Sequence, residues 1–215
     1  MKKIFIIVCV SLIGFGQKLD AQTTTAPIDN RSLFNYGIKA GINNANVWDE
    51  ESQNFNANRK LGFVFGAFAS LPFGTLLGFQ PELLIAQKGF KGSGVLLGSE
   101  YSFARTTTHI DIPLQLQVKP SEMLTILVGP QISYLIHQRD VFTFGANSTA
   151  QEQEFDNENL RKSTLGFTMG ADVNFTRLVA SGRLGYDFQN NNGDGTSSTP
   201  RYKNHWLQLT LGYKI

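Results

Sequence analysis

The last nine residues of the 215-residue chain, LQLTLGYKI, constrain the fold more than any other segment. Apolar side chains occupy every odd position from Leu207 to Ile215, and Gln208, Thr210 and Lys214 share the even positions with a glycine. Because successive side chains of a strand point to opposite faces, this pattern predicts a strand with one apolar and one polar face. Nine residues tilted by about 45° just cross the hydrocarbon core of a bilayer. The segment therefore predicts the closing strand of a transmembrane β-barrel.

The N-terminus has the pattern of an export signal. Lys2 and Lys3 precede the apolar run IFIIVCVSLIGFG, and the small residue Ala21 precedes a cleavage point. Cys9 lies within the run, so the chain after Ala21 has no cysteine, which excludes disulfides and thiolate metal sites there. Export also argues against a cytoplasmic enzyme. We expect a signal peptide over residues 1–21, a flexible leader over 22–34 and a barrel domain over 35–215.

Charge excludes two further classes of protein. Removing Lys2, Lys3, Lys18 and Asp20 with the signal from 19 basic and 17 acidic residues leaves 16 of each. This balance, without a basic block, argues against nucleic-acid binding. No segment after the signal has the unbroken run of about 18 apolar residues that a transmembrane helix needs.

Eight segments alternate with a period of two. The expected strands cover residues 36–43, 62–71, 77–88, 109–119, 124–137, 164–175, 178–188 and 207–215. Their connections are alternately long and short, and the long ones are 44–61, 89–105, 138–163 and 189–203. The sequence therefore predicts an all-β fold, an eight-stranded antiparallel up-and-down transmembrane β-barrel with short periplasmic turns and long extracellular loops. Pro81 lacks a ladder donor and predicts a bulge in the third strand.

Alternation alone also fits a soluble or periplasmic lipocalin-like barrel that binds a small apolar ligand inside. The two faces favour lipid outside, because the face opposite the apolar one mixes glycines with few charges, as a narrow, side-chain-filled lumen without a pore requires. The candidate lumen charge network is Lys39, Glu82, Lys88, His109, Asp111, Asp172, Arg183, Asp187 and Lys214. The aromatic residues expected at the membrane interfaces are Tyr36, Phe63, Tyr134, Phe175, Tyr186, Phe188, Trp206 and Tyr213.

Several segments resemble one family. They are GIKAGIN, GFQPELLIAQKGF, HIDIPLQLQVK, LTILVGPQISYLI and NHWLQLTLGYKI, together with a signal that ends in AQ. Over most of residues 35–215 the chain resembles the PorT-like outer-membrane β-barrel family of Bacteroidetes. The shared segments are barrel motifs, so the resemblance implies the fold and an outer-membrane location. PorT itself is associated with type IX secretion, but the resemblance assigns a secretion role to no residue here.

Acid–base residues suggest one enzymatic alternative. His109 and Asp111, with His137 and Asp187, lie toward the long-loop end, where some outer-membrane barrel enzymes acting on lipid or peptide place such groups. No nucleophile motif accompanies them, so we expect no enzyme. The NNNGDG segment, residues 190–195, lacks the first aspartate and the final glutamate of a calcium loop, and we expect no metal and no cofactor.

The long loops remain as the place for function, in binding, adhesion or support of the envelope or of secretion. The third loop has an aromatic and acidic composition that suits a protein or cationic partner. Its candidate binding surface is Phe142, Phe144, Glu152, Glu154, Phe155 and Asp156. A loop that is merely solvated is the alternative. We expect contact with outer-membrane lipid, a protein partner at the loops, no nucleic acid and a monomer.

Overall fold

The computed structural model describes residues 29–49, 57–96, 99–144, 147–154, 161–191 and 202–215. Within them the chain forms one antiparallel sheet. Its strands are β1 (Asn35–Asp49), β2 (Asn58–Pro72), β3 (Leu77–Leu96), β4 (Ser99–Val118), β5 (Leu124–Phe144), β6 (Asn147–Glu154), β7 (Ser163–Asn174), β8 (Leu178–Asp187) and β9 (Tyr202–Lys214). A 3-10 helix, η1 (Asn30–Ser32), precedes them. None of the described helical residues forms a helix long and apolar enough to cross a membrane.

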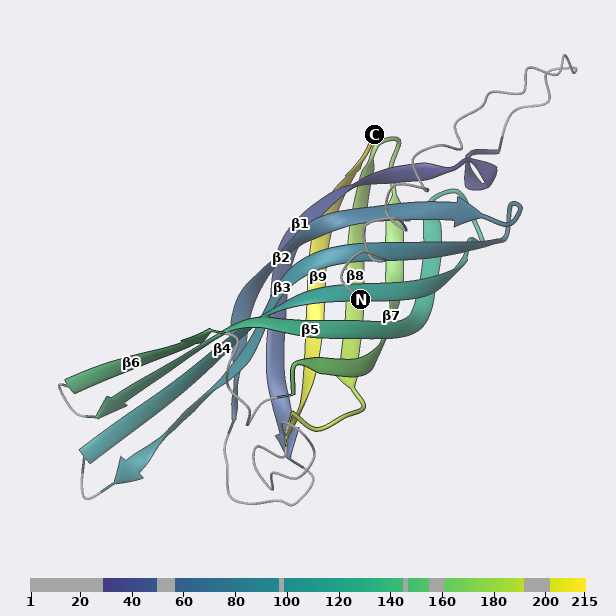
Figure 1. The fold of residues 1–215 in the computed structure, drawn as a ribbon. Helices are drawn as coiled ribbons and strands as arrows, with labels where there is room; N and C mark the ends of the chain where they lie inside the picture. The colour runs from purple at the N-terminus through teal and green to yellow at the C-terminus, as the bar shows by residue number, and fades with distance from the viewer. Residues whose placement is uncertain (1–28, 50–56, 97–98, 145–146, 155–160, 192–201) are drawn as a thin grey trace, which may run out of the picture.

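The sheet closes on itself as a barrel (Figure 1). Successive strands pair with each other except β6 with β7, and the first strand pairs with the last, with Gly37 opposite Lys214 and Asp49 opposite Tyr202. Both β4 and β7 pair with β5, so every strand except β6 is part of the closed wall. The prediction of an eight-stranded antiparallel barrel is confirmed.

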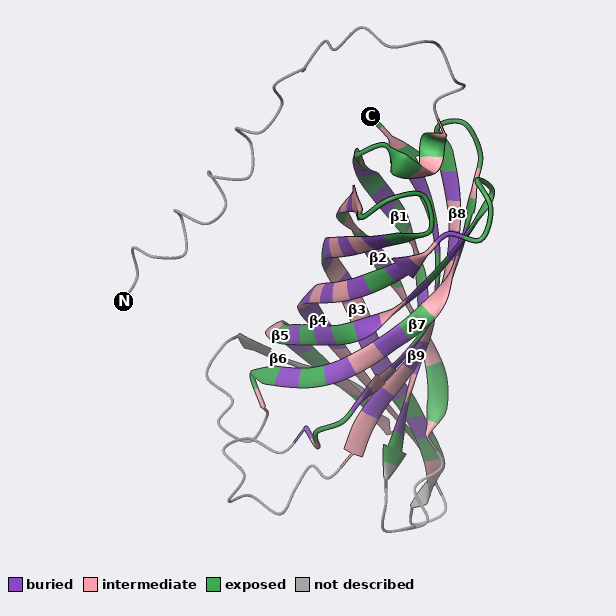
Figure 2. Ribbon diagram, turned by 90° about the vertical axis from the view of Figure 1, so that its right-hand side faces the viewer, coloured by how far each residue is buried: buried purple, intermediate pink, exposed green. Residues whose placement is uncertain are grey.

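The exposed and buried faces alternate as the sequence predicts (Figure 2). Ile38, Leu209 and Leu211 are 59%, 49% and 69% exposed, whereas Gln208 and Thr210 between and beside them are buried. Apolar side chains therefore cover the outside of the barrel, and its interior holds mostly polar side chains with a few apolar ones such as Leu84 and Leu127. A soluble barrel with an apolar interior is excluded.

Pro81 does not cause the predicted bulge. Phe68 lies opposite Glu82 and Leu71 opposite Phe79, so the register between β2 and β3 is the same on both sides of the proline. The ladder can pass Pro81 because the strand needs only to omit one donor there. The register shift between β2 and β3 occurs farther along, between Arg59 and Val64.

A second irregularity changes the phase of β5. Thr108 pairs with His137 but the next residue, His109, pairs with Leu135, so β5 carries one extra residue at this point. An extra residue exchanges the faces of all later positions. Ser133 is on the lumen side before this bulge, and Gln138, 3% exposed, takes that side after it. His137, which the period-two pattern places on the lumen face, therefore falls on the other face.

Two of the predicted long loops are mostly β-structure. Beyond the barrel, residues 89–96, 99–107, 137–144 and 147–154 pair as a four-stranded antiparallel sheet in the order β3, β4, β5, β6. Figure 1 shows this extracellular sheet projecting from one side of the barrel. Apolar and polar residues are mixed on both faces of this sheet, because here neither lipid nor a core requires one uniformly apolar face. The strict alternation that identified the membrane strands is therefore missing from these residues.

The last residues of the predicted flexible leader pack against the opposite end. Asp29 caps η1 by accepting a hydrogen bond from the Arg31 backbone N–H at 2.9 Å. Hydrogen bonds from the Arg31 guanidinium and backbone hold the pKa of Asp29 below its usual range. Arg31 also donates to the Lys119 carbonyl at 3.2 Å, and the Lys119 ammonium donates to the Arg31 carbonyl at 3.0 Å. This reciprocal pair joins the leader to the periplasmic turn after β4.

Candidate functional site

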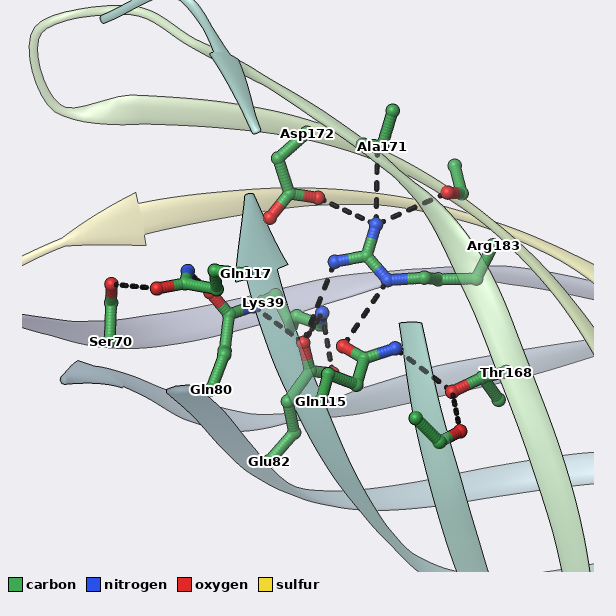
Figure 3. A network of polar contacts seen from close by, with 12 residues as sticks. Lys39, Ser70, Gln80, Glu82, Gln115, Gln117, Thr168, Ala171, Asp172 and Arg183 are labelled. Carbon is green, nitrogen blue, oxygen red and sulfur yellow. Dashed lines mark hydrogen bonds and ion pairs between the residues drawn. The ribbon is translucent and has the colours of Figure 1, made fainter. Parts of the chain in front are cut away.

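Four charged side chains from four strands meet at the centre of the lumen. Lys39 Nζ lies 2.6 Å from Glu82 Oε2, and Arg183 Nη1 lies 2.7 Å from Asp172 Oδ1. The other guanidinium nitrogen, Nη2, lies 3.7 Å from Glu82 Oε1 and joins the two pairs. None of the four residues is more than 4% exposed. β1, β3, β7 and β8 are therefore linked by charge across the barrel, as Figure 3 shows.

Glycines on the neighbouring strands make room for these long side chains. Lys39 has Gly66 as its partner on β2 and Gly212 as its partner on β9. Arg183 lies opposite Gly170 of β7. A residue with a side chain at these positions would occupy the same narrow interior as the charged groups. The glycines on the polar faces of the strands therefore leave space for the charged side chains of the neighbouring strands.

Neutral polar side chains, which the predicted charge network does not include, extend the network. Gln80 donates to Glu82 Oε1 at 2.7 Å, and Gln117 donates to Gln80 Oε1 at 2.6 Å. Gln115 donates to Thr168 Oγ1 at 2.9 Å and accepts from Arg183 Nε at 3.4 Å. Each of these glutamines lies an even number of residues from Glu82 on β3 or from Asp111 on β4, and residues at such distances share one face of a strand. This spacing could have identified them as lumen residues from the sequence.

A second charged layer surrounds Lys88. Its ammonium lies 3.1 Å from Asp111 Oδ2, donates to Ser133 Oγ at 3.0 Å and lies 3.8 Å from the centre of the Trp206 ring. Trp206 is 2% exposed, so its predicted place at the membrane interface is wrong. It shares the parity of Gln208 on β9, which puts it inside, and it fits there because Gly185 opposite it has no side chain.

The remaining predicted lumen residues differ in their surroundings. Asp187 accepts a hydrogen bond from Asn204 at 2.7 Å, and His109 is buried, with no hydrogen-bond partner for its Nδ1 among the described residues. Lys214 is half-buried at the periplasmic end and forms no ion pair within the described part of the chain. His137, on the other face, is not brought together with His109. The proposed rim site is therefore not assembled.

An Arg–Asp pair and three aromatic rings lie where the lumen meets the extracellular sheet. Arg105 donates to Asp140 through Nε at 2.8 Å and Nη2 at 2.7 Å, and to the Tyr202 hydroxyl at 3.1 Å. The Phe90 ring lies 5.3 Å from that of Tyr202 and 5.9 Å from that of Phe103. The sequence analysis placed Arg105 and Asp140 in loops, so it assigned them no partner.

From this point an aromatic face continues onto the extracellular sheet. Tyr101 and Phe103 on β4 pair with Phe144 and Phe142 on β5, which puts all four on one face. The Tyr101 and Phe142 rings stack at 6.1 Å, and Phe142 is 42% exposed. Tyr101 packs over Gly94 of β3, where a β-carbon would come within 2.9 Å of the tyrosine ring.

Two glutamates of the predicted surface belong to β6. In the ladder Glu152 pairs with Arg139, and Glu154 pairs with His137. Their side chains are not among those that the structure describes. Phe155 and Asp156 lie outside the described residues. No group of three or more His, Cys, Asp or Glu side chains that could hold a metal occurs in the described part of the chain.

Comparison with known families accounts for the barrel. The family described as outer membrane protein beta-barrel domain matches residues 20–193. The chain belongs to this family. An outer-membrane location follows, with the apolar face of this barrel in lipid, the short turns in the periplasm and the extracellular sheet outside the cell.

Solved structures of other outer-membrane barrels are similar in outline. Ail, the attachment invasion locus protein of Yersinia pestis, is 14% identical, with a TM-score of 0.43 over 84% of this chain and 98% of its own. Neisserial surface protein A is 9% identical, with a TM-score of 0.48 over 84% and 97%. OprG from Pseudomonas aeruginosa is 12% identical, with a TM-score of 0.38 over 84% and 95%. Comparison with curated proteins gave no match.

Proposed function

We propose that this outer-membrane barrel is not an enzyme and that it binds a protein partner outside the cell through the aromatic face of its extracellular sheet. The observation that carries the proposal is the position of Tyr101, Phe103 and Phe142 on one face, beyond the barrel, with Phe142 42% exposed. Aromatic side chains are enriched in the parts of protein interfaces that contribute most to affinity.

The sheet is built to hold these rings still. Strands β3, β4 and β5 all run from the barrel wall into the extracellular sheet. The ladder between β3 and β4 keeps one register over its whole length, whereas the ladder between β4 and β5 shifts by one residue between Thr108 and His109. Rings that are already ordered lose little conformational entropy when a partner binds. A rigid aromatic face therefore suits recognition better than a solvated loop does.

The lumen offers little support for catalysis. Lys88 lies 3.0 Å from the Ser133 hydroxyl, but its ammonium also binds the Asp111 carboxylate at 3.1 Å. Within the described structure, His109 Nδ1 makes no hydrogen bond that would orient the ring. A nucleophile aligned with an oriented base is the arrangement that acyl transfer needs.

The test is capture of partners on whole cells with paired variants. Phe142→Ser removes an exposed ring from the aromatic face, and Val141→Ser, on the opposite face of the same strand, is the matched control. We expect Phe142→Ser to lose the captured partner and Val141→Ser to keep it, with both proteins retaining heat-modifiable migration. Equal capture by the two variants contradicts the proposal.

A larger deletion tests the same surface at the level of the strand. Removing residues 146–160 eliminates β6 but leaves the pairing of β4 with β5 and the whole barrel wall. We expect insertion to survive and capture to weaken. Failure of insertion would make β6 structural. The resemblance to PorT-like proteins supports an envelope or secretion component as the partner, and the identity of the captured protein tests that point.

A further inference from the structure

A small cavity lies at the periplasmic mouth, where Asp172 and Gln80 of the central network form part of its lining, and away from the extracellular sheet. It has a volume of about 60 Å³, room for about two waters. The side chains that matter here are Lys119, Lys214, Ser70, Gln117 and Arg31. Arg31 belongs to η1, so the cavity is enclosed between the barrel and the N-terminal turn.

Two ammonium groups line this cavity without a carboxylate of their own. Lys119 is 5% exposed, and among the described residues its Nζ donates only to neutral oxygens, the Arg31 carbonyl at 3.0 Å and Ser70 Oγ at 3.4 Å. Lys214 is half-buried and makes no ion pair within the described residues. Burial and the charge of Lys214 both lower the pKa of Lys119. Positive charge is therefore in excess at this point.

The nearby acids do not remove that excess. The charge of Asp29 acts on Lys119, but its carboxylate is bound by Arg31 at 2.6 Å. The charge of Asp172 acts on Lys214, but its carboxylate is bound by Arg183 at 2.7 Å. Glu122 also lines the cavity, yet it is exposed and forms no ion pair with either lysine in the described structure.

We propose that this cavity binds a small oxyanion, a phosphate or carboxylate group, between Lys119 and Lys214. A buried charge is costly unless it is paired, and the two ammonium groups supply charged donors for several oxygens. The Ser70 hydroxyl donates to Gln117 Oε1 at 2.8 Å and the Gln117 amide donates to Gln80 Oε1 at 2.6 Å, so the two lysines are the groups that would bind the anion. A cation is disfavoured by the two lysines. Because Arg31 and Lys119 exchange hydrogen bonds at its edge, the bound anion also holds η1 against the mouth.

The experiment uses the full barrel, refolded in micelles and labelled with nitrogen-15. Sodium phosphate, sodium acetate and sodium chloride are titrated at equal ionic strength while the amide signals of Ser32, Gln117 and Lys119 are followed. We expect saturable shifts with phosphate or acetate and none with chloride. Phosphate alone would identify a tetrahedral anion, and acetate alone would identify a carboxylate as the ligand group.

Paired variants assign the site. Lys119→Met keeps the long side chain but removes its charge, and we expect binding at least about tenfold weaker, as the loss of a charge-assisted hydrogen bond predicts. Lys162→Met, at an exposed lysine on the extracellular side, is the control and should bind as the unaltered protein does. If Lys119→Met does not fold, Lys214→Gln tests the same charge pair. Shifts that never saturate, or that are equal in the site variants and the control, overturn the proposal.

Discussion

At the scale of single residues, Glu82 is the anion that two cations share. It lies 2.6 Å from Lys39 Nζ and 3.7 Å from Arg183 Nη2, and it also accepts from Gln80 at 2.7 Å. A buried ion pair is often no more stabilising than apolar groups of the same volume. Removing one partner is different, because the remaining charge is left buried and unpaired. We therefore expect the stability of the barrel to fall when one charged partner is removed, and to change little when both partners are replaced by apolar residues.

Glu82→Gln is expected to destabilise the barrel by about 3–5 kcal/mol, because Lys39 then lacks its counter-ion in the lumen. Urea unfolding in lipid vesicles measures the loss. Glu122→Gln, an exposed glutamate in a periplasmic turn, is the control with little effect expected. Lys39→Met combined with Glu82→Met should recover most of the stability. A single variant as mild as the control contradicts this account of the network.

Leu209→Arg tests which face is in lipid. Leu209 is 49% exposed on the outside of β9, and an arginine at the centre of the membrane costs about 2–4 kcal/mol. Phe73→Arg places the same charge in a periplasmic turn, at a residue that is 66% exposed, where the cost is about 0–1 kcal/mol. Insertion yield and unfolding should therefore separate the two variants. Similar yields would mean that Leu209 does not face the hydrocarbon core.

At the scale of elements, the sequence was informative where the membrane imposes a pattern. Lipid requires an apolar outer face, so alternation located every strand of the barrel and both faces of β9. Trp206 was misplaced because its ring suggested an interface although its even position placed it inside. The bulge near His137 carries no compositional signal, and β6 is polar throughout. Contacts across the lumen, such as Lys39 with Glu82, depend on the tilt and stagger of strands, which alternation does not specify.

The tip of the extracellular sheet should unfold locally without unfolding of the barrel. Gly94→Val would force the Tyr101 ring away from β3 and from Phe142. Hydrogen exchange should then become faster in residues 99–104, with unfolding of the barrel unchanged, because local opening in the extracellular sheet does not expose the lumen. Ser93→Val, at the exposed neighbouring position, should leave exchange as it is. Faster exchange throughout β7 and β8 would show that the two parts unfold together.

At the scale of the whole molecule, the barrel is closed by its own side chains. The Lys39, Glu82, Asp172 and Arg183 network crosses the centre, and Arg105 with Phe90 lies over the extracellular end. Eight strands leave an interior only wide enough for such packing. We therefore expect no continuous path for ions through the described part of the barrel.

Conductance in planar bilayers should accordingly stay near the baseline over the whole range of voltages that the bilayer tolerates. The refolded protein, verified by its heat-modifiable migration, is added to both sides, and a known porin serves as the positive control. Long-lived openings of uniform size in several preparations would show that the lumen network yields to form a channel.

The unbroken length of β4 sets how far the protein reaches. Its 20 residues, at about 3.3 Å each, make a strand of about 66 Å. With a tilt of about 45° and an apolar band about 25 Å tall, its outer end stands about 20 Å above the hydrocarbon surface. The ladder between β3 and β4 keeps one register from the membrane to the outer end of the sheet. A force applied to that outer end is therefore transmitted through backbone hydrogen bonds to the barrel wall. A partner bound at that end would be held at a fixed height and angle above the cell surface.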